Sequence, residues 1–315
     1  MKRALITGIS GQDGSYLAER LLAAGYEVTG LVRSPQSGRS PNLAAVDGKV
    51  RFATADLRDP ESLRVAIGTA KPQAIYHLAA PTSVADSWND PHGTQRLIAG
   101  ATEAVLEAAV ALTEPARVFV ASSSEIFGDA GESPQNERSP KRPRTPYGEA
   151  KLAAFELVRA ARADGLFAVS GITYNHESPR RPPHFLPRKV TYGAAEIALG
   201  NAQTLTLGDL GAVRDWSDAR DIVRGATLAL DADEPDDYVL ASGVGRTVGE
   251  LVDVAFAAAG IARDDRIEVD PAFVRPPEAT ALVGDPAKAR DELGWKPEFS
   301  FEQTIGEMVA TDLAR

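Results

Sequence analysis

A tyrosine and a lysine four residues apart give the first chemical signal in this chain of 315 residues. Residues 145–151 (TPYGEAK) begin with a threonine that can cap a helix and a proline that suits its first position. Tyr147 and Lys151 would then share one face of that helix. A free tyrosine has a pKa of about 10 and is a poor base at neutral pH, but a nearby ammonium group favours the phenolate. The pair predicts a tyrosine acid/base, although an ordinary helix gives the same pattern by chance.

A glycine-rich segment near the start of the chain predicts a nucleotide site. Residues 7–14 (TGISGQDG) have the spacing GxxGxxG and lie between a predicted strand and a predicted helix. Glycines there bring backbone N–H groups and the helix N-terminus against a pyrophosphate. Such turns also occur for packing alone. We expect the segment to bind a dinucleotide through Gly8, Gly11, Gln12, Asp13 and Gly14.

The end of the second predicted strand indicates which dinucleotide binds. An NAD enzyme usually places Asp or Glu there for the ribose hydroxyls, whereas this chain has Arg33 and no acid. An arginine at that point suits the 2′-phosphate of NADP, and the alternative is a solvated surface arginine. After the third strand, Asp56 and Leu57 are expected near the adenine. After the fourth strand, we expect the nicotinamide half beside Leu78, Ala79 and Ala80.

A serine run followed by a glutamate, ASSSEIFG over residues 121–128, ends the fifth predicted strand. Ser123 and Glu125 are unusual choices for structure alone where a strand leaves the core. A simple dehydrogenase needs no second base, but an enzyme that also removes a carbon-bound proton does. Glu125 is therefore a candidate for that base, and the alternative is a helix cap or a surface carboxylate.

The elements that must position these residues alternate between strand and helix. Short apolar runs predict strands at 4–7, 27–32, 50–53, 74–77, 118–121 and 167–173, and helical patterns fall at 13–24, 60–70, 95–112 and 146–164. This alternation indicates an α/β fold with a doubly wound parallel sheet, the Rossmann fold. Residues 129–145 are expected to form a surface loop.

The last third of the chain, with helices expected at 188–200 and 247–259, predicts a smaller mixed α/β lobe that binds substrate at the ends of the strands. We expect residues 1–173 plus about 212–241 to form the dinucleotide-binding domain. Residues 174–211 plus 242–315 would form the substrate-binding lobe.

The composition of the chain argues against several classes of binding partner. The net charge of −10 argues against a nucleic-acid or anionic-membrane surface. The chain has no cysteine, so it has no disulfide or thiolate metal site, and we expect no metal. No stretch reaches the roughly 20 apolar residues of a membrane span, and the apolar run at the N-terminus is too short for a signal peptide. We expect a cytoplasmic protein.

The tyrosine–lysine pair and the glycine loop together resemble the short-chain dehydrogenases of the extended type. Several segments are similar to the GDP-mannose 4,6-dehydratase family in particular. They are 7–19 (TGISGQDGSYLAE), 175–181 (NHESPRR), 214–216 (RDW), 270–278 (DPAFVRPPE), 284–286 (GDP) and 293–297 (LGWKP). Spread over nearly the whole chain, they imply an NADP-dependent enzyme that assembles as a homodimer or homotetramer.

The resemblance also implies roles for individual residues. Ser123 would bond the reacting sugar hydroxyl, while His176 and Arg181 would contact the cofactor. The GDP-sugar would lie among Thr82, Ser83, Asn175, Lys189, Arg214, Arg275 and Glu278. The cations among them suit a diphosphate, although any one alone is more often a solvated surface residue.

The sequence departs from this family at several positions. Ser123 replaces a threonine, Phe127 replaces a tyrosine, and Ile98 lies at or near a position where the family has asparagine. The segment after Arg33 lacks a second consecutive arginine and a longer loop. Residues 83–88 (SVADSW) look closer to the related GDP-4-keto-6-deoxymannose reductases, which can also have a serine–glutamate pair at the fifth strand.

The resemblance implies the conversion of GDP-mannose to GDP-4-keto-6-deoxymannose by C4 oxidation, elimination of water across C5 and C6, and hydride return to C6. One alternative is an NADPH-dependent reductase of that keto-sugar, or another nucleotide-sugar epimerase or dehydratase. A second alternative is a nucleotide-sugar-binding protein that has lost the chemistry.

Overall fold

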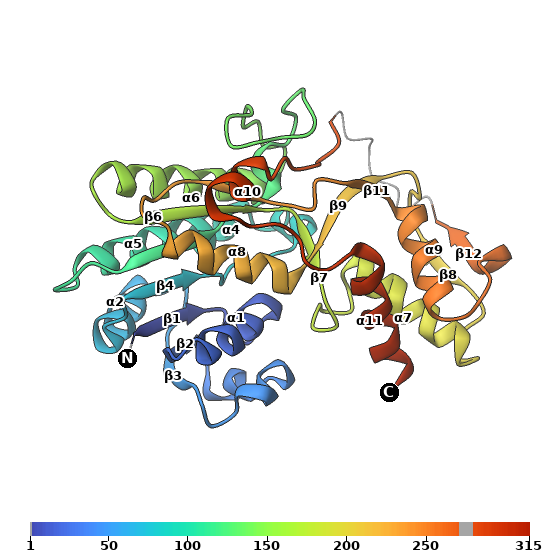
Figure 1. Cartoon of the computed structure of the whole chain (residues 1–315), viewed down its shortest axis with the longest axis horizontal. Helices are drawn as coiled ribbons and strands as arrows, with labels where there is room; N and C mark the ends of the chain where they lie inside the picture. Colours follow the sequence, from blue (N-terminus) through green and yellow to red (C-terminus); the bar gives the residue numbers. More distant parts are fainter. Residues whose placement is uncertain (1, 271–279) are drawn as a thin grey trace.

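The computed structural model describes residues 2–270 and 280–315 and is built on one large sheet. Its strands are β1 (Arg3–Thr7), β2 (Glu27–Val32), β3 (Arg51–Thr54), β4 (Ala74–His77), β5 (Arg117–Ala121), β6 (Ala168–Thr173) and β10 (Tyr238–Leu240). They lie in the order β10-β6-β5-β4-β1-β2-β3, and every neighbouring pair is parallel (Figure 1). The predicted doubly wound sheet is confirmed, and each of the six predicted strands lies within one residue of an observed strand.

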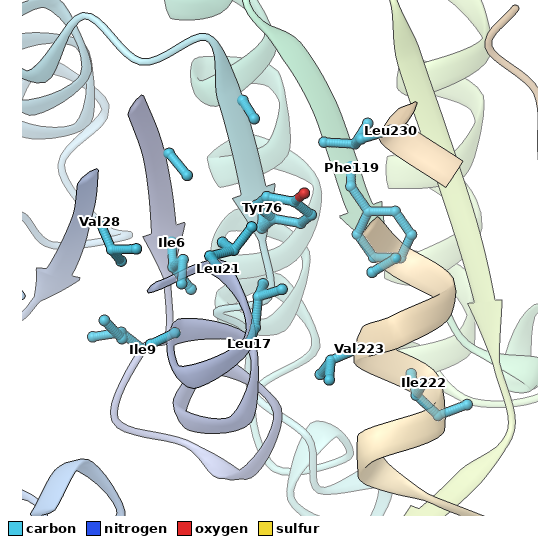
Figure 2. Close-up of a cluster of buried hydrophobic side chains, with 14 of the residues drawn as sticks. Ile6, Ile9, Leu17, Leu21, Val28, Tyr76, Phe119, Ile222, Val223 and Leu230 are labelled. Atoms are coloured by element: carbon cyan, nitrogen blue, oxygen red, sulfur yellow. The ribbon is translucent and has the colours of Figure 1, made fainter. Parts of the chain in front are cut away.

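Helices cover both faces of this sheet. They are α1 (Gln12–Ala23), α2 (Pro60–Ala70), α5 (Ala101–Val110), α6 (Pro146–Ala163) and α8 (Ala219–Asp231). Helices α1 and α8 pack on one face, and α2, α5 and α6 pack on the other. Figure 2 shows the first of these layers, where Leu21 of α1 and Val223 of α8 lie near Tyr76 and Phe119 of the sheet. Because both faces are covered, the central strands β1, β4 and β5 are buried over nearly their whole length rather than in alternation, whereas the edge strand β3 is largely exposed.

The prediction of one regular helix over residues 95–112 is wrong, both in where the helix begins and in its continuity. It begins earlier, as α4 (Pro91–Gln95), because the Asp90 side chain accepts a hydrogen bond from the Gly93 amide at 2.8 Å and caps it. A π-helical turn, η3 (Arg96–Gly100), then joins α4 to α5. Such turns insert an extra residue into a helix, and this one carries the buried Ile98.

A second group of elements forms the expected smaller lobe of mixed α/β structure. It contains a three-stranded sheet in the order β11-β9-β7 and a two-stranded sheet, β12-β8. The strands are β7 (Asn175–Glu177), β8 (Leu205–Leu207), β9 (Val213–Asp218), β11 (Gly245–Thr247) and β12 (Ile267–Val269), and the helices are α7 (Leu186–Ala198), α9 (Val248–Ala258) and α11 (Phe301–Leu313). These helices share one apolar core with β8 and β9 and lie on the right in Figure 1.

The chain returns to the main sheet before it ends. Helix α10 (Ala287–Leu293) lies beside β10, and Trp295 is fully buried in the core between α8 and the sheet. Its indole N–H donates to the Asp221 carbonyl at 2.8 Å. The last third of the chain therefore contributes to both cores, and the division into two domains stays a prediction.

The remaining elements are short. They are α3 (Val84–Ser87), η1 (Pro35–Arg39), η2 (Pro41–Val46), η4 (Ser124–Ile126) and η5 (Asp264–Arg266). Across residues 2–270 and 280–315, no helix combines the length and apolarity needed to cross a bilayer.

The glycine loop between β1 and α1 is tight because its backbone folds onto itself. Gly8 has a φ of +74°, which side chains rarely tolerate, and a Cβ there would lie 2.9 Å from the Ala79 nitrogen. A Cβ at Gly14 would lie 2.3 Å from the Gly8 carbonyl oxygen and 2.6 Å from the Ile9 Cα. Both neighbours are backbone atoms, so they cannot rotate away.

The loop yields a stability prediction with an internal control. Gly14→Ala should lower the free energy of unfolding by about 1–3 kcal/mol because the methyl group overlaps backbone. Gly68→Ala, in α2 with open space around the added methyl, should raise it by about 0.5–1 kcal/mol. Urea denaturation of both variants measures the difference, and an unchanged midpoint for Gly14→Ala would contradict the close packing.

Candidate active site

The predicted tyrosine and lysine lie at the start of α6, as the helix signals indicated. The Thr145 hydroxyl accepts a hydrogen bond from the Gly148 amide at 3.0 Å, and Pro146 occupies the first turn. Tyr147 is buried, and its backbone N–H donates to the Ser87 hydroxyl at 3.2 Å. The Lys151 ammonium donates to the Ala121 carbonyl at 2.7 Å, which ties α6 to the end of β5.

Ser123 and Glu125 lie in the turn η4, directly after β5. The Ser123 hydroxyl accepts from the Glu125 amide at 3.3 Å and is also hydrogen-bonded to the Tyr147 side chain. A Cβ at Gly148 would lie 2.7 Å from the Glu125 carbonyl oxygen, so only glycine lets this turn approach α6 so closely. The structure thus brings Ser123, Glu125, Tyr147 and Lys151 together at the carboxyl end of β5.

Burial controls the protonation of this group. Burial raises the pKa of Tyr147 to about 12, and the negative charge of Glu125 adds to it, while the Ser123 hydrogen bond and Arg181 act in the opposite direction. Burial also lowers the pKa of Lys151 to about 8, against the attraction of Asp13. The expectation that Lys151 and the oxidised nicotinamide together favour the phenolate of Tyr147 stays a prediction. In the protein alone, burial outweighs the groups that lower the pKa of Tyr147. At neutral pH Tyr147 is a phenol, ready to donate a proton.

A buried threonine joins the glycine loop to the end of β4. The Thr7 hydroxyl accepts from the Leu78 and Ala79 amides at 3.1 and 3.0 Å and lies 2.9 Å from His77 Nδ1. Its single proton must therefore point to Nδ1, so His77 carries its own proton on Nε2. Burial lowers the pKa of His77 to about 3, with Lys151 adding to the effect, and the ring is neutral. This contact places Leu78 and Ala79 beside the glycine loop.

A second network joins the glycine loop to the segment after β6. The Gln12 amide donates to the His176 carbonyl at 3.0 Å and accepts from the Ser178 hydroxyl at 2.8 Å. The His176 ring lies 2.9 Å from an Asp13 carboxylate oxygen. Arg181 forms an ion pair with the buried Glu177 at 3.3 Å. The predicted cofactor residues of the two segments are therefore neighbours, and their contact with a cofactor stays a prediction.

The loop fits the pyrophosphate of a dinucleotide. Within the described chain, no side chain caps α1, whose N-cap residue is Gly11, so the first backbone N–H groups are open to phosphate oxygens. A side chain at Gly8 or Gly14 would fill this cradle with atoms that overlap backbone. Among the described residues, no group of three or more His, Asp or Glu side chains is placed to hold a metal ion.

The predicted adenosine end contains a cation that the sequence analysis did not single out. Arg58 binds the Asp56 carboxylate with its guanidinium at 2.6 Å. Hydrogen bonds from Arg58 lower the pKa of Asp56 to about 2, and the charge of Arg33 contributes. Arg33 is exposed and lies close enough to act on Asp56. Leu57 instead packs against the core between the sheet and α2.

The predicted substrate residues are distributed over the small lobe and the segment after β4. Asn175 and Arg214 lie on the adjacent strands β7 and β9, where Asn175 pairs with Trp216. Lys189 lies on α7, and Ser83 caps α3 by accepting from the Asp86 amide at 3.1 Å. Thr82 is exposed, Ala80 packs beside Tyr147, and Arg275 and Glu278 lie outside the described residues. Their roles toward a substrate stay predictions.

The two apolar departures from the family pattern are core residues. Phe127 is fully buried and stacks on Tyr174 with ring centroids 6.3 Å apart. Ile98 packs against Tyr147 and Ala150. Each position holds an apolar side chain where a hydroxyl or an amide would need a hydrogen-bond partner.

The family model and the sequence relatives agree on one family, and the similar solved structures share the fold under other names. The family model described as GDP-mannose 4,6 dehydratase matches residues 5–308. The chain is 42% identical to GDP-mannose 4,6 dehydratase 2 of Arabidopsis thaliana, over 99% of this chain and 87% of that protein. Among solved structures, it is similar to UDP-glucose 4-epimerase of Thermus thermophilus in complex with NAD, at 30% identity and a TM-score of 0.83, over 98% of both chains. It is also similar to RMD from Pseudomonas aeruginosa complexed with NADPH, at 25% identity and a TM-score of 0.82, over the full length of both.

The threonine that joins β1 to β4 gives a prediction about the integrity of the site. Thr7→Val keeps the shape but leaves two backbone amides and His77 Nδ1 without their partner. The free energy of unfolding should fall by about 2–4 kcal/mol, since each unsatisfied buried group costs roughly 1–3 kcal/mol. Thr7→Ser, which keeps the hydroxyl, should recover most of this. Equal stability of Thr7→Val and Thr7→Ser in urea would show that the hydroxyl does not hold the two strands together.

Proposed function

Because this chain belongs to the GDP-mannose 4,6-dehydratase family, we propose that it converts GDP-mannose to GDP-4-keto-6-deoxymannose. The observation that supports a lyase rather than a simple oxidoreductase is a second acid/base beside the tyrosine. Glu125 lies in the turn that contacts α6 one residue after Tyr147, and its charge acts on the phenol. Tyr147 and Glu125 lie side by side, and a dehydratase needs two such groups, one for the C4 hydroxyl and one for the C5 proton.

The chemistry explains why both groups are needed. Loss of the C6 hydroxyl requires removal of the C5 proton, which is not acidic in an unmodified sugar. A ketone at C4 makes that proton acidic, because the resulting carbanion is an enolate. Glu125 would take the C5 proton and return a proton to the departing C6 hydroxyl, so that one water leaves and the carboxylate is regenerated.

Tyr147 and its neighbours would act at the C4 hydroxyl. Ser123 would hold that hydroxyl in line, and Tyr147 would accept its proton. Tyr147 would deliver this proton to C5 when a hydride adds to C6, so that the ketone at C4 remains in the product. With a pKa of about 12, Tyr147 needs an additional positive charge to act as a base at neutral pH. When bound, NADP supplies the hydride acceptor and donor and, in its oxidised form, that charge. Lys151 is fixed near the same ring by the Ala121 carbonyl.

The choice of NADP rests on Arg33. The similar solved structures include one complex with NAD and one with NADPH, so the fold alone accommodates either. Arg33 at the end of β2, with Arg58 nearby on Asp56, forms a positive surface that suits a 2′-phosphate. Because this position holds an arginine, the end of β2 has no carboxylate there to bind the ribose hydroxyls of NAD.

Three finer expectations stay proposals. A homodimer or homotetramer would bury the shallow groove between α5 and α6, where Gly100 and Ala153 allow close approach of a second copy. Guanosine and mannose as the base and sugar rest on the family. The cytoplasmic location stays a prediction from composition.

The first experiment tests the cofactor. Arg33→Ala should reduce the preference for NADP⁺ over NAD⁺ by about one to two decades, because a charge-assisted hydrogen bond is worth roughly 1.5–3 kcal/mol. Calorimetric titration of both cofactors measures this. Arg51→Ala, which removes an exposed arginine at the amino end of β3, is the control and should leave the preference unchanged. Equal binding of both cofactors by the unmodified protein would contradict the proposal.

The second experiment separates the two acid/base groups. Tyr147→Phe should block C4 oxidation and lower turnover of GDP-mannose by at least about a hundredfold. Glu125→Gln should allow oxidation but stop elimination, so that reduced-cofactor absorbance appears without dehydrated product. Glu149→Gln is the matched control. It changes an exposed glutamate on α6, the helix that carries Tyr147, and should behave as the unmodified protein.

Product analysis completes that test. With deuterium at C4 of GDP-mannose, the unmodified protein should lose one water and carry the label at C6. Label in solvent, or normal dehydration by Glu125→Gln, would overturn the mechanism. Turnover only with the keto-sugar and added NADPH would assign the protein to the reductases, to which residues 83–88 are similar.

A further inference from the structure

The hydrogen bonds of His176 fix its charge. Its Nδ1 lies 2.7 Å from the Tyr174 carbonyl oxygen, and its Nε2 lies 2.9 Å from a carboxylate oxygen of Asp13. Both partners are acceptors. A neutral imidazole has a single N–H and would leave one nitrogen facing an acceptor without a proton, whereas an imidazolium donates from both nitrogens. His176 is only about one-eighth exposed, so water does not replace a lost partner easily.

The charges around the ring agree with this geometry. Burial by itself lowers the pKa of His176, but the charge and hydrogen bond of Asp13 and the Tyr174 carbonyl together raise it above its ordinary value, against Arg181. The pKa of Asp13 is lowered in turn, since His176 and the Gln12 hydrogen bond outweigh burial. The other groups that face the pair are Glu177 on β7 and Lys151 on α6.

Asp13 creates an electrostatic problem that His176 resolves. Asp13 lies in the first turn of α1, where a carboxylate is favourable toward the helix dipole. The same turn is the proposed binding site of a doubly charged pyrophosphate, which an unpaired carboxylate would repel. An imidazolium hydrogen-bonded to Asp13 makes the pair neutral.

We propose that His176 is a positioning residue, held protonated by its two hydrogen-bond acceptors, whose imidazolium neutralises Asp13, so that the first turn of α1 can accept the pyrophosphate of the dinucleotide. This rests on the cofactor of the proposed function. Above the pKa of His176 the ring loses one of its two hydrogen bonds and Asp13 is left uncompensated. Cofactor affinity should therefore be full below that pKa and decrease as the pH rises through it.

Proton NMR tests the charge directly. The chain has four histidines, so the His176 resonance can be assigned by its loss in His176→Gln. It should titrate above the ordinary histidine pKa of about 6.5 in the unmodified protein and at a lower pH in Asp13→Asn. A His176 ring that stays neutral from pH 6 to 8, or one whose titration is unchanged in Asp13→Asn, would overturn the proposal.

Calorimetric binding of NADP⁺ between pH 6 and 9 tests the consequence. His176→Gln should bind about tenfold more weakly at pH 6.5, with the pH dependence reduced to that of the 2′-phosphate, which itself titrates near pH 6. The double variant Asp13→Asn/His176→Gln should recover most of this loss, because the repelling carboxylate is gone. His92→Gln, an exposed histidine on α4, is the control and should match the unmodified protein.

The double variant distinguishes charge compensation from a merely structural role. If His176 only holds the two segments together, the double variant will bind as weakly as His176→Gln or more weakly at every pH, and the proposal is wrong. Neither measurement involves GDP-mannose. Failure of turnover with normal His176 titration and pH-dependent NADP⁺ binding would overturn the proposed reaction and leave this inference standing.

Discussion

The close approach of the glycine loop to the ends of β4 and β7 sets the geometry of the whole site. Gly8 can lie against the Ala79 nitrogen only because it has no side chain, and Thr7 then satisfies the amides of Leu78 and Ala79. From the other side, Gln12 binds the backbone of His176. These contacts place the N-terminus of α1 between the main sheet and the small lobe, where a dinucleotide can reach both.

Burial rather than charge sets the resting protonation of the titratable groups in and beside the proposed active site. Tyr147 is held protonated, Lys151 is shifted toward neutrality, and His77 is neutral, each chiefly because it is removed from water. The Asp13–His176 pair is the exception, since each member stabilises the charge of the other. Lys151 and Arg181 lie near Tyr147 but do not offset its burial, so the proposed base needs the further positive charge of the oxidised cofactor.

The sequence predicted what depends on local pattern. Short apolar runs located six strands, and a threonine–proline start located α6 and the tyrosine on it. Helix α11 was missed although Ser300 and Gln303 form a capping box at its start, a signal that could have found it. Contacts between segments that are distant in the sequence could not be predicted from local pattern. The bond from Gln12 to His176 spans 164 residues, and the direction of the Lys151 ammonium depends on where β5 ends.

In the proposed mechanism, the second acid/base group depends on one turn. Tyr147 and Lys151 need only the start of a helix, but a second base must approach the same sugar from the strand beside it. Ser123 begins η4 by accepting the Glu125 amide, and Gly148 lets that turn lie directly against α6. A larger residue than glycine at 148 would push the carboxylate-bearing turn away from Tyr147, since its Cβ would overlap the Glu125 carbonyl. The proposed elimination therefore depends on a glycine that bears no functional group, as much as on the glutamate itself.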